Sequence, residues 1–251
     1  MSGHSHWATI KRSKGAADAK RGRMFTKFGR ELEIAARSGG GDPSSNFRLR
    51  LVMDNAKQAQ MPKENIERAI LRGTGQLKGE SIEEIQYEGY GLQGAAMVVE
   101  VTTNNKNRAA SEVRSVFTRH GGNLGATGSV SWMFERKGYI SILPSNGGAE
   151  ELALMAIDAG ADDVKMDEDL VEVFTKAEEL QKIKEAFEER KIPFETAQLS
   201  WVPKSLTQLD QKATMANMRL IDSLEELEDV AQVYSNLEIG DEAMAAYEAE
   251  Q

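Results

Sequence analysis

Basic side chains are concentrated near the amino terminus, where they are suited to binding phosphate. Residues 1–72 contain 15 Lys and Arg against 7 Asp and Glu, a formal charge of +8, whereas residues 73–251 contain 16 against 33, a formal charge of −17. Such segregation is typical of a polyanion binder, because a merely solvated surface usually mixes both signs. The residues expected to contact phosphate are Lys11, Arg12, Lys14, Lys20, Arg21, Arg23, Lys27, Arg30, Arg48, Arg50, Lys57, Lys63, Arg68 and Arg72. The competing interpretation is a basic surface that serves only solubility.

One aromatic side chain, Trp7, lies among these cations. Aromatic rings between basic residues stack on unpaired bases in many single-strand binders. Trp7 is therefore included among the nucleic-acid-binding residues. An equally good interpretation is that its ring anchors the amino-terminal segment on the folded domain.

A second candidate contact surface lies at the two ends of a helix predicted over residues 107–119. Its polar and basic members are Asn105, Lys106, Arg108, Arg114, Arg119 and His120. The glycine-rich loop of residues 121–128 follows directly, and its backbone amides are potential anion ligands. The alternative is an ordinary amphipathic helix that ends in a glycine turn.

Signals for enzymatic chemistry are weak. The chain has no Cys and three His, so neither a thiol nucleophile nor a typical zinc site is predicted. The run Gly89-Tyr90-Gly91-Leu92-Gln93-Gly94 matches G-x-G-x-x-G, but it joins two strand patterns, whereas a dinucleotide site needs a strand followed by a helix. We therefore predict a hairpin turn there, and no enzyme activity, cofactor, metal or small-molecule substrate.

The hydropathy pattern indicates a cytoplasmic protein. The longest apolar stretch, Ala95 to Val99, is far shorter than a membrane span, and the basic amino terminus is not followed by an apolar region. We therefore expect neither membrane insertion nor export. The sequence does not indicate an oligomeric state.

Three short helices are predicted after a basic arm over residues 1–23. The first starts at Met24 and stops at Gly39, Gly40 and Gly41, since apolar residues recur with helical spacing between them. Asp42 and Pro43 favour the start of a second helix, and Pro62 the start of a third that ends near Gly73.

The remainder has an alternating strand and helix pattern typical of an α+β fold. Strands are expected near residues 85–101 and 130–134, around the helix at 107–119. A β-α-β-β-α-β series then covers residues 139–202, and a helix at about 209–227 and a strand at 233–239 close the chain. The expected fold is thus an amino-terminal three-helix domain with a basic arm, followed by two ferredoxin-like α/β sandwich units, one inserted in the other. The predicted domains are 1–78, 79–136 together with 206–251, and the inserted 137–205.

The segment from Leu224 to Gln251 contains acidic residues and neither Lys nor Arg. It does not favour contact with phosphate. It either keeps the protein soluble or competes with nucleic acid for the basic domain.

Several sequence blocks resemble the YebC/PmpR family over essentially the whole chain. They are Gly3-His4-Ser5-His6-Trp7-Ala8-Thr9-Ile10-Lys11, Asp18-Ala19-Lys20-Arg21-Gly22-Arg23-Met24-Phe25-Thr26-Lys27, Met61-Pro62-Lys63-Glu64-Asn65-Ile66-Glu67-Arg68-Ala69-Ile70, Asn105-Lys106-Asn107-Arg108, Gly121-Gly122-Asn123-Leu124-Gly125 and Val233-Tyr234-Ser235-Asn236. The chain departs from the family's usual residues at His6, Thr9 and Asn104. The resemblance implies three domains, a cytoplasmic location and no known enzymatic activity.

The same resemblance implies a role in gene expression. Family members are named probable transcriptional regulators that bind DNA, while organellar and some bacterial relatives are regarded as translation factors acting on the ribosome. The sequence has no helix-turn-helix, zinc-finger or RNA-recognition signature that separates the two roles. We therefore predict a DNA-binding transcriptional regulator, with an RNA-associated or ribosome-associated translation factor as the alternative.

Overall fold

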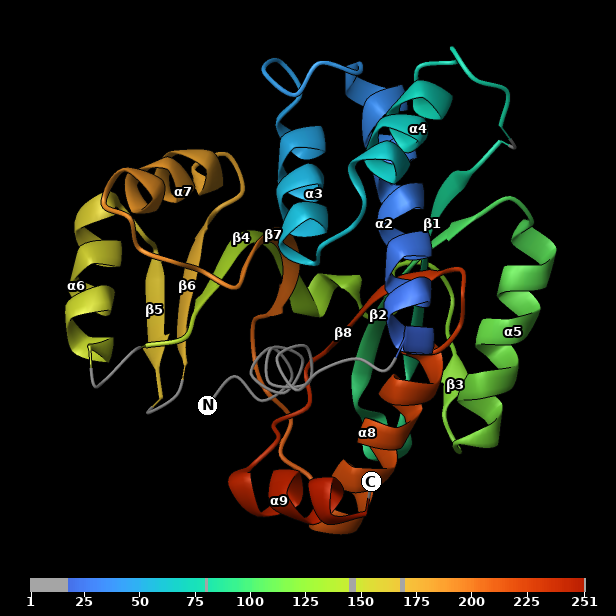
Figure 1. The fold of residues 1–251 in the computed structure, drawn as a ribbon. Coiled ribbons are helices and arrows are strands. Elements are labelled where there is room, and N and C mark those ends of the chain that lie inside the picture. Colours follow the sequence, from blue (N-terminus) through green and yellow to red (C-terminus); the bar gives the residue numbers. More distant parts are fainter. Residues whose placement is uncertain (1–17, 80, 145–147, 168–169, 251) are drawn as a thin grey trace.

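The computed structural model describes residues 18–79, 81–144, 148–167 and 170–250. Three helices come first, and two four-stranded antiparallel sheets with their helices follow, as Figure 1 shows. The predicted α+β class and its three-helix start are confirmed. Four of the predicted contact residues, Trp7, Lys11, Arg12 and Lys14, lie outside the described residues.

The helical region consists of α2 (Asp18–Gly39), α3 (Phe47–Gln58) and α4 (Lys63–Gly73). The three helices share a core that includes Leu32, Leu49 and Ile66. Burial of these side chains stabilises the short helices α3 and α4, since isolated helices of 12 and 11 residues are marginal in water.

Two helix starts differ from the predicted ones. Helix α2 begins at Asp18, six residues before Met24, because Asp is favourable at a helix amino terminus and good helix formers follow it. Helix α3 begins at Phe47, where Asn46 Oδ1 accepts a hydrogen bond from the Leu49 amide at 3.0 Å. Asp42 instead forms a local turn, in which its carboxylate accepts from the Ser44 amide at 2.9 Å.

The first sheet has the strand order β3-β1-β2-β8. Its strands are β1 (Glu83–Tyr90), β2 (Ala96–Thr103), β3 (Asn123–Leu124) and β8 (Val230–Ser235). The predicted turn of residues 89–94 joins β1 to β2 as an antiparallel hairpin and contains the short 3-10 helix η1 (Leu92–Gly94). Helices α5 (Lys106–Arg119) and α8 (Gln211–Glu225) supply side chains to the core beside this sheet, among them Phe117 and Met218.

The second sheet has the order β5-β6-β4-β7, which is the split β-α-β arrangement predicted for this part of the chain. Its strands are β4 (Phe134–Ile142), β5 (Asp163–Met166), β6 (Val171–Lys176) and β7 (Thr196–Pro203). Helices α6 (Ala149–Ala159) and α7 (Leu180–Glu189) pack against it, as Figure 1 shows.

The predicted strand over residues 130–134 is wrong. Residues Ser131–Met133 form the 3-10 helix η2, and the strand that starts at Phe134 belongs to the second sheet. The amides of Val130 and Ser131 donate to the buried carboxylate of Glu88, so they are not available to a strand ladder.

The chain leaves the first sheet after β3, builds the second sheet, and returns with β8 at the edge beside β2. This path agrees with an insertion, although the exact limits of 137–205 and of the other two domains stay a prediction. A further helix, α9 (Asp241–Ala249), was not predicted, and its Met244 and Tyr247 are buried in the core of the first unit.

Contacts between the units fix their mutual arrangement. Glu100 of the first sheet accepts hydrogen bonds from Arg136 at 2.6 Å and Trp201 at 3.0 Å, both on the second sheet. Helix α3 binds the second unit through Asn55, which donates to the Ala197 carbonyl at 3.1 Å. The helical region therefore contacts both α/β units.

Candidate nucleic-acid interface

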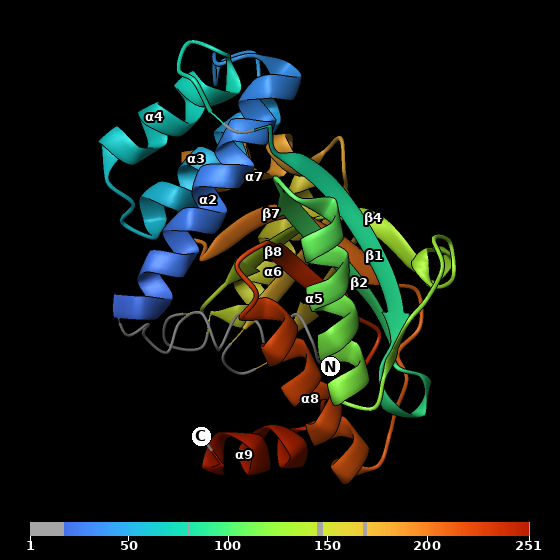
Figure 2. The same cartoon turned by 90° about the vertical axis from the view of Figure 1, so that its right-hand side faces the viewer.

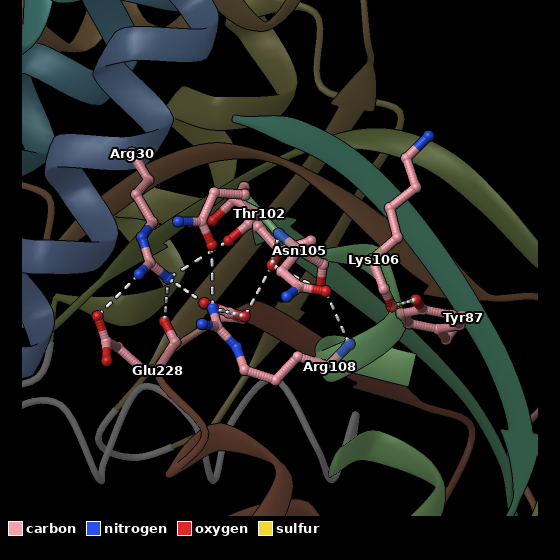
Figure 3. Close-up of polar contacts among 10 residues, drawn as sticks. Arg30, Tyr87, Thr102, Asn105, Lys106, Arg108 and Glu228 are labelled. Atoms are coloured by element: carbon pink, nitrogen blue, oxygen red, sulfur yellow. Dashed lines mark hydrogen bonds and ion pairs between the residues drawn. The ribbon is translucent and has the colours of Figure 1, made fainter. Parts of the chain in front are cut away.

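Two of the predicted phosphate-binding cations point from α2 into the first α/β unit. Arg30 makes ion pairs with Asp229 at 2.6 Å and Glu228 at 2.7 Å, and also donates to the Thr102 carbonyl at 3.3 Å (Figure 3). Lys27 donates to the Glu225 carbonyl at 2.5 Å. These contacts hold α2 against the loop between α8 and β8, so both side chains have a structural role.

Asp229 is the centre of this arrangement. Its side chain is 4% exposed and also receives Arg108 of α5 at 2.8 Å and the Thr103 hydroxyl at 2.8 Å. Burial by itself would raise the pKa of Asp229, but hydrogen bonds from Arg108 and Thr103 and the charge of Arg30 lower that pKa below its usual value. The carboxylate is thus ionised at neutral pH and joins α2, β2 and α5.

A second buried carboxylate, Glu33 on α2, neutralises two more arginines. Its side chain is 3% exposed and pairs with Arg37 at 2.9 Å and with Arg72 of α4 at 3.2 Å. Arg48 of α3 pairs with Glu84 of β1. Burial lowers the pKa of Arg48, but the hydrogen bond and charge of Glu84 outweigh burial and raise it. Intramolecular partners thus account for Arg48 and Arg72, and phosphate binding by either residue stays a prediction.

Other cations of the helical region remain open to solvent. Arg23 near the start of α2 and Arg68 on α4 are exposed and make no ion pair within the described part of the chain. Arg21 is exposed, and Lys20 lies in the first turn of α2. Lys57 and Lys63 are exposed and contact only carboxylates of their own helices, each at 3.5 Å. Exposed pairs of this length contribute little, so these lysines can still bind phosphate.

The remaining predicted cation, Arg50, lines a groove of about 410 Å³ between α3 and α7. Lys57 and Lys184 line it as well, but so do Asp54, Glu185 and Glu188. The mixed charge makes this groove a poor site for a polyanion.

The exposed cations are spread over two parts of the helical region. Figure 2 shows α4 on the side turned away from the sheets. The beginning of the long helix α2 lies at the end of α2 that points away from α4. A helix of 22 residues is about 33 Å long. The exposed cations are thus distributed over α2, α3 and α4, which fits a set of separate phosphate contacts better than one recognition helix.

The second candidate surface, around α5, is largely occupied by contacts within the chain. Asn105 caps the helix by accepting from the Arg108 amide at 3.1 Å, and Lys106 pairs with Glu83 at 2.5 Å. Arg114 and Arg119 are exposed and make no ion pair among the described residues. Burial, followed by the charges of Arg119 and Arg219, lowers the pKa of His120, so this side chain is neutral at pH 7.

Several backbone amides in the loop of residues 121–128, which is predicted to bind an anion, are used within the protein. Gly122 donates to the Phe117 carbonyl at 2.9 Å, Gly125 to the Glu88 carbonyl at 2.7 Å and Gly128 to the Glu88 carboxylate at 2.8 Å. These three amides are satisfied within the protein. Of this surface, Arg114 and Arg119 are exposed cations without an ion pair among the described residues, and contact by Asn105, Lys106 and Arg108 stays a prediction.

Residues 225–229 belong to the acidic segment for which the sequence predicts either a role in solubility or competition with nucleic acid for the basic domain. In the structure this segment contacts α2 through Glu225, Glu228 and Asp229. The structural role of Asp229 could not be predicted from the sequence. The residues around Asp229 do not show that it pairs with Arg30, which is 199 positions away.

The part of the chain that the structure describes contains no cluster of three or more His, Asp or Glu suited to a metal ion. In the same residues, no helix is both long and apolar enough to cross a membrane.

Two family models match the chain in sequence. Residues 5–76 match the TACO1/YebC protein N-terminal domain, and residues 82–237 match the TACO1/YebC second and third domain. Among curated relatives, a probable transcriptional regulatory protein of Desulfosudis oleivorans is 48% identical and covers 96% of this chain and 98% of its own. Another of that name from Aquifex aeolicus is 49% identical, with 97% and 98% covered.

A solved structure is also similar. The crystal structure of a conserved hypothetical protein from Aquifex aeolicus has a TM-score of 0.84 and 49% identity. The match covers 89% of this chain and 93% of the other.

Proposed function

Because the chain belongs to the TACO1/YebC family, we propose that it is a cytoplasmic, non-enzymatic regulator of gene expression that binds nucleic acid, in the first instance DNA. Its relatives carry the name of probable transcriptional regulatory proteins. The observation that carries the proposal is the basic amino-terminal region, where Arg23 and Arg68 have no carboxylate partner among the described residues.

Charge density along the chain supports the beginning of α2 as the main contact. Lys11, Arg12 and Lys14 precede this helix in sequence, and Lys20, Arg21 and Arg23 occupy its first turns. Six cations thus fall within residues 11–23, next to one acid, Asp18. Such side chains neutralise phosphates and position a protein on nucleic acid, but they do not read bases by themselves.

A second candidate function is an RNA-associated or ribosome-associated translation factor. The observation that favours it is the net charge of −17 on residues 73–251, which form the body that α2 packs against. A straight duplex laid along α2 would bring its phosphates near this acidic body, at a cost in repulsion. An RNA crevice that takes in only the amino-terminal segment avoids this repulsion.

Two measurements on the full-length protein distinguish the candidates. The first is selection from a random duplex library, in which enrichment of a sharp motif supports the DNA regulator. The second is sedimentation of a cell lysate at modest salt, with and without ribonuclease. Ribosome association that ribonuclease abolishes, without an enriched duplex motif, would contradict the transcriptional role. The absence of both would contradict the proposal as a whole.

The same measurements need a control for unspecific effects of charge. Arg68→Ala removes an exposed cation, whereas Arg48→Ala removes one that is paired with Glu84. Both variants change the net charge by one unit. If the proposal holds, Arg68→Ala weakens binding more than Arg48→Ala does.

A further inference from the structure

One aromatic ring is exposed outside the helical region. Trp132 lies in η2, between the glycine-rich loop and β4, and is 66% exposed. The other large apolar side chains that are exposed in the described residues are aliphatic or Met. Because burying an indole is strongly favourable, an exposed one is a candidate for contact with a partner.

The polar group of this indole is already satisfied. Trp132 Nε1 donates to the Ser129 carbonyl at 3.0 Å, within the same short segment. A partner can therefore contact the flat π surface of the indole, whereas the N–H donor is already used within the protein. This favours stacking over recognition by a polar contact.

The segment that bears Trp132 is held rigidly before any partner arrives. The side chain of Glu88, a residue that is 3% exposed, accepts from the amides of Gly128, Val130 and Ser131, each at 2.8 Å. Burial raises the pKa of Glu88, but these hydrogen bonds outweigh burial and lower it, so the acceptor is a carboxylate at neutral pH. Since the loop is already ordered, binding at Trp132 costs little conformational entropy.

A cation lies beside the backbone of the residue that bears the ring. Lys204 donates from Nζ to the Trp132 carbonyl at 2.9 Å and is exposed. An ammonium group has three donors, so two remain for a phosphate. The exposed aliphatic residues Leu154 and Ile157 lie on α6 and do not surround the indole. Protein hot spots sit in well-packed apolar patches, whereas base-stacking rings occur together with cations that bind the adjacent phosphates, and Lys204 can supply such a cation beside Trp132.

We propose that Trp132 stacks on an unpaired nucleobase of RNA or single-stranded DNA, and that Lys204 contacts the adjacent phosphate. This inference rests on the proposed nucleic-acid binding. The stacking contact at Trp132, directly before β4, is then additional to the phosphate contacts of the helical region. The amino-terminal cations then supply affinity for any polyanion, and Trp132 supplies a preference for unpaired strands.

The test compares Trp132→Ala, Trp132→Phe and wild type by fluorescence anisotropy. The probes are a labelled 12-nucleotide single strand of RNA, the same sequence as DNA, and a DNA duplex of equal length. Loss of one stacked base weakens binding on the order of tenfold. We expect that loss for Trp132→Ala on at least one single strand, little change on the duplex, and near wild-type affinity for Trp132→Phe. The two single strands show which sugar the site accepts.

Leu154→Ala is the matched control, because Leu154 is 64% exposed, similar to Trp132, and lies on another element. If Trp132→Ala binds every probe as Leu154→Ala and wild type do, the inference is overturned while the proposed function stands. Equal losses on duplex and single strands would also overturn it, since they would indicate no stacking. Wild type that binds none of the probes would contradict both proposals. Trp132→Ala could instead keep full oligonucleotide binding but lose a protein partner that ribonuclease treatment does not remove. That result would overturn the inference and assign the ring to a protein contact.

Discussion

Replacing Asp229 by Asn removes the charge that joins the helical region to the first α/β unit and preserves the shape of the side chain. The carboxylate is 4% exposed, and the loss of one partner from a buried ion pair costs about 3 to 5 kcal/mol. Arg30 keeps Glu228 and a carbonyl as partners, and the half-exposed Arg108 regains water. We therefore expect Asp229→Asn to lower the free energy of unfolding by about 2 to 3 kcal/mol at pH 7, below the full cost of a buried pair.

The pH dependence of that loss identifies its cause. The pKa of Asp229 is lowered in the folded protein, so its stabilising effect is complete above the unfolded value of about 3.9. It is lost as the pH falls through the lower folded pKa. Urea unfolding followed by circular dichroism should thus show a difference between wild type and Asp229→Asn that is constant from pH 5 to 7 and shrinks below about pH 4.

The control for this comparison is Glu228→Gln. Glu228 also pairs with Arg30, but its side chain is 66% exposed, so the expected loss is at most about 1 kcal/mol. The reasoning is refuted if Asp229→Asn is as stable as wild type at pH 7. It is also refuted if the difference between the two proteins persists unchanged at pH 3.

Three further changes test other parts of the structure. Deleting residues 1–17 should leave a cooperative thermal transition, because α2 starts at Asp18, but weaken nucleic-acid binding more than tenfold; a lost transition would make the segment structural. Arg68→Ala should weaken different duplexes by similar factors in competition assays, as a phosphate contact does, and a change in their rank order would indicate base reading. Glu88→Gln should destabilise the protein by about 1 to 3 kcal/mol in urea unfolding, since loop amides lose their charged acceptor; unchanged stability would argue against a locked loop.

The elements that sequence reasoning located best depend on local patterns. Helix α6 and strand β5 belong to the β-α-β-β-α-β series predicted over residues 139–202, because regular apolar spacing and flanking glycine or acidic turns define both. The error at residues 130–134 has a non-local cause. Glu88, about 40 positions earlier, takes the amides of Val130 and Ser131, and no property of the segment itself indicates that contact.

In the candidate site, too, features set by local sequence could be predicted, whereas features set by long-range contacts could not. Segregation of charge identified the basic helical region, but it could not show which cations are neutralised within the fold. Arg30 and Asp229 are 199 positions apart, so only the folded chain brings them together. Arg23 and Arg30 look alike in the sequence, yet one is exposed and the other holds two units together.

The central claim, that the amino-terminal cations bind nucleic-acid phosphates, is tested most directly by the salt dependence of affinity. The measurement is the slope of log affinity against log salt concentration for wild type and for Lys11, Arg12 and Lys14 replaced together by Ala. Each phosphate contact with a duplex contributes about −0.9 to that slope. The expected result is a slope that is flatter by about two to three in the triple variant. Equal slopes for the two proteins would contradict the claim and place the phosphate contacts elsewhere in the chain.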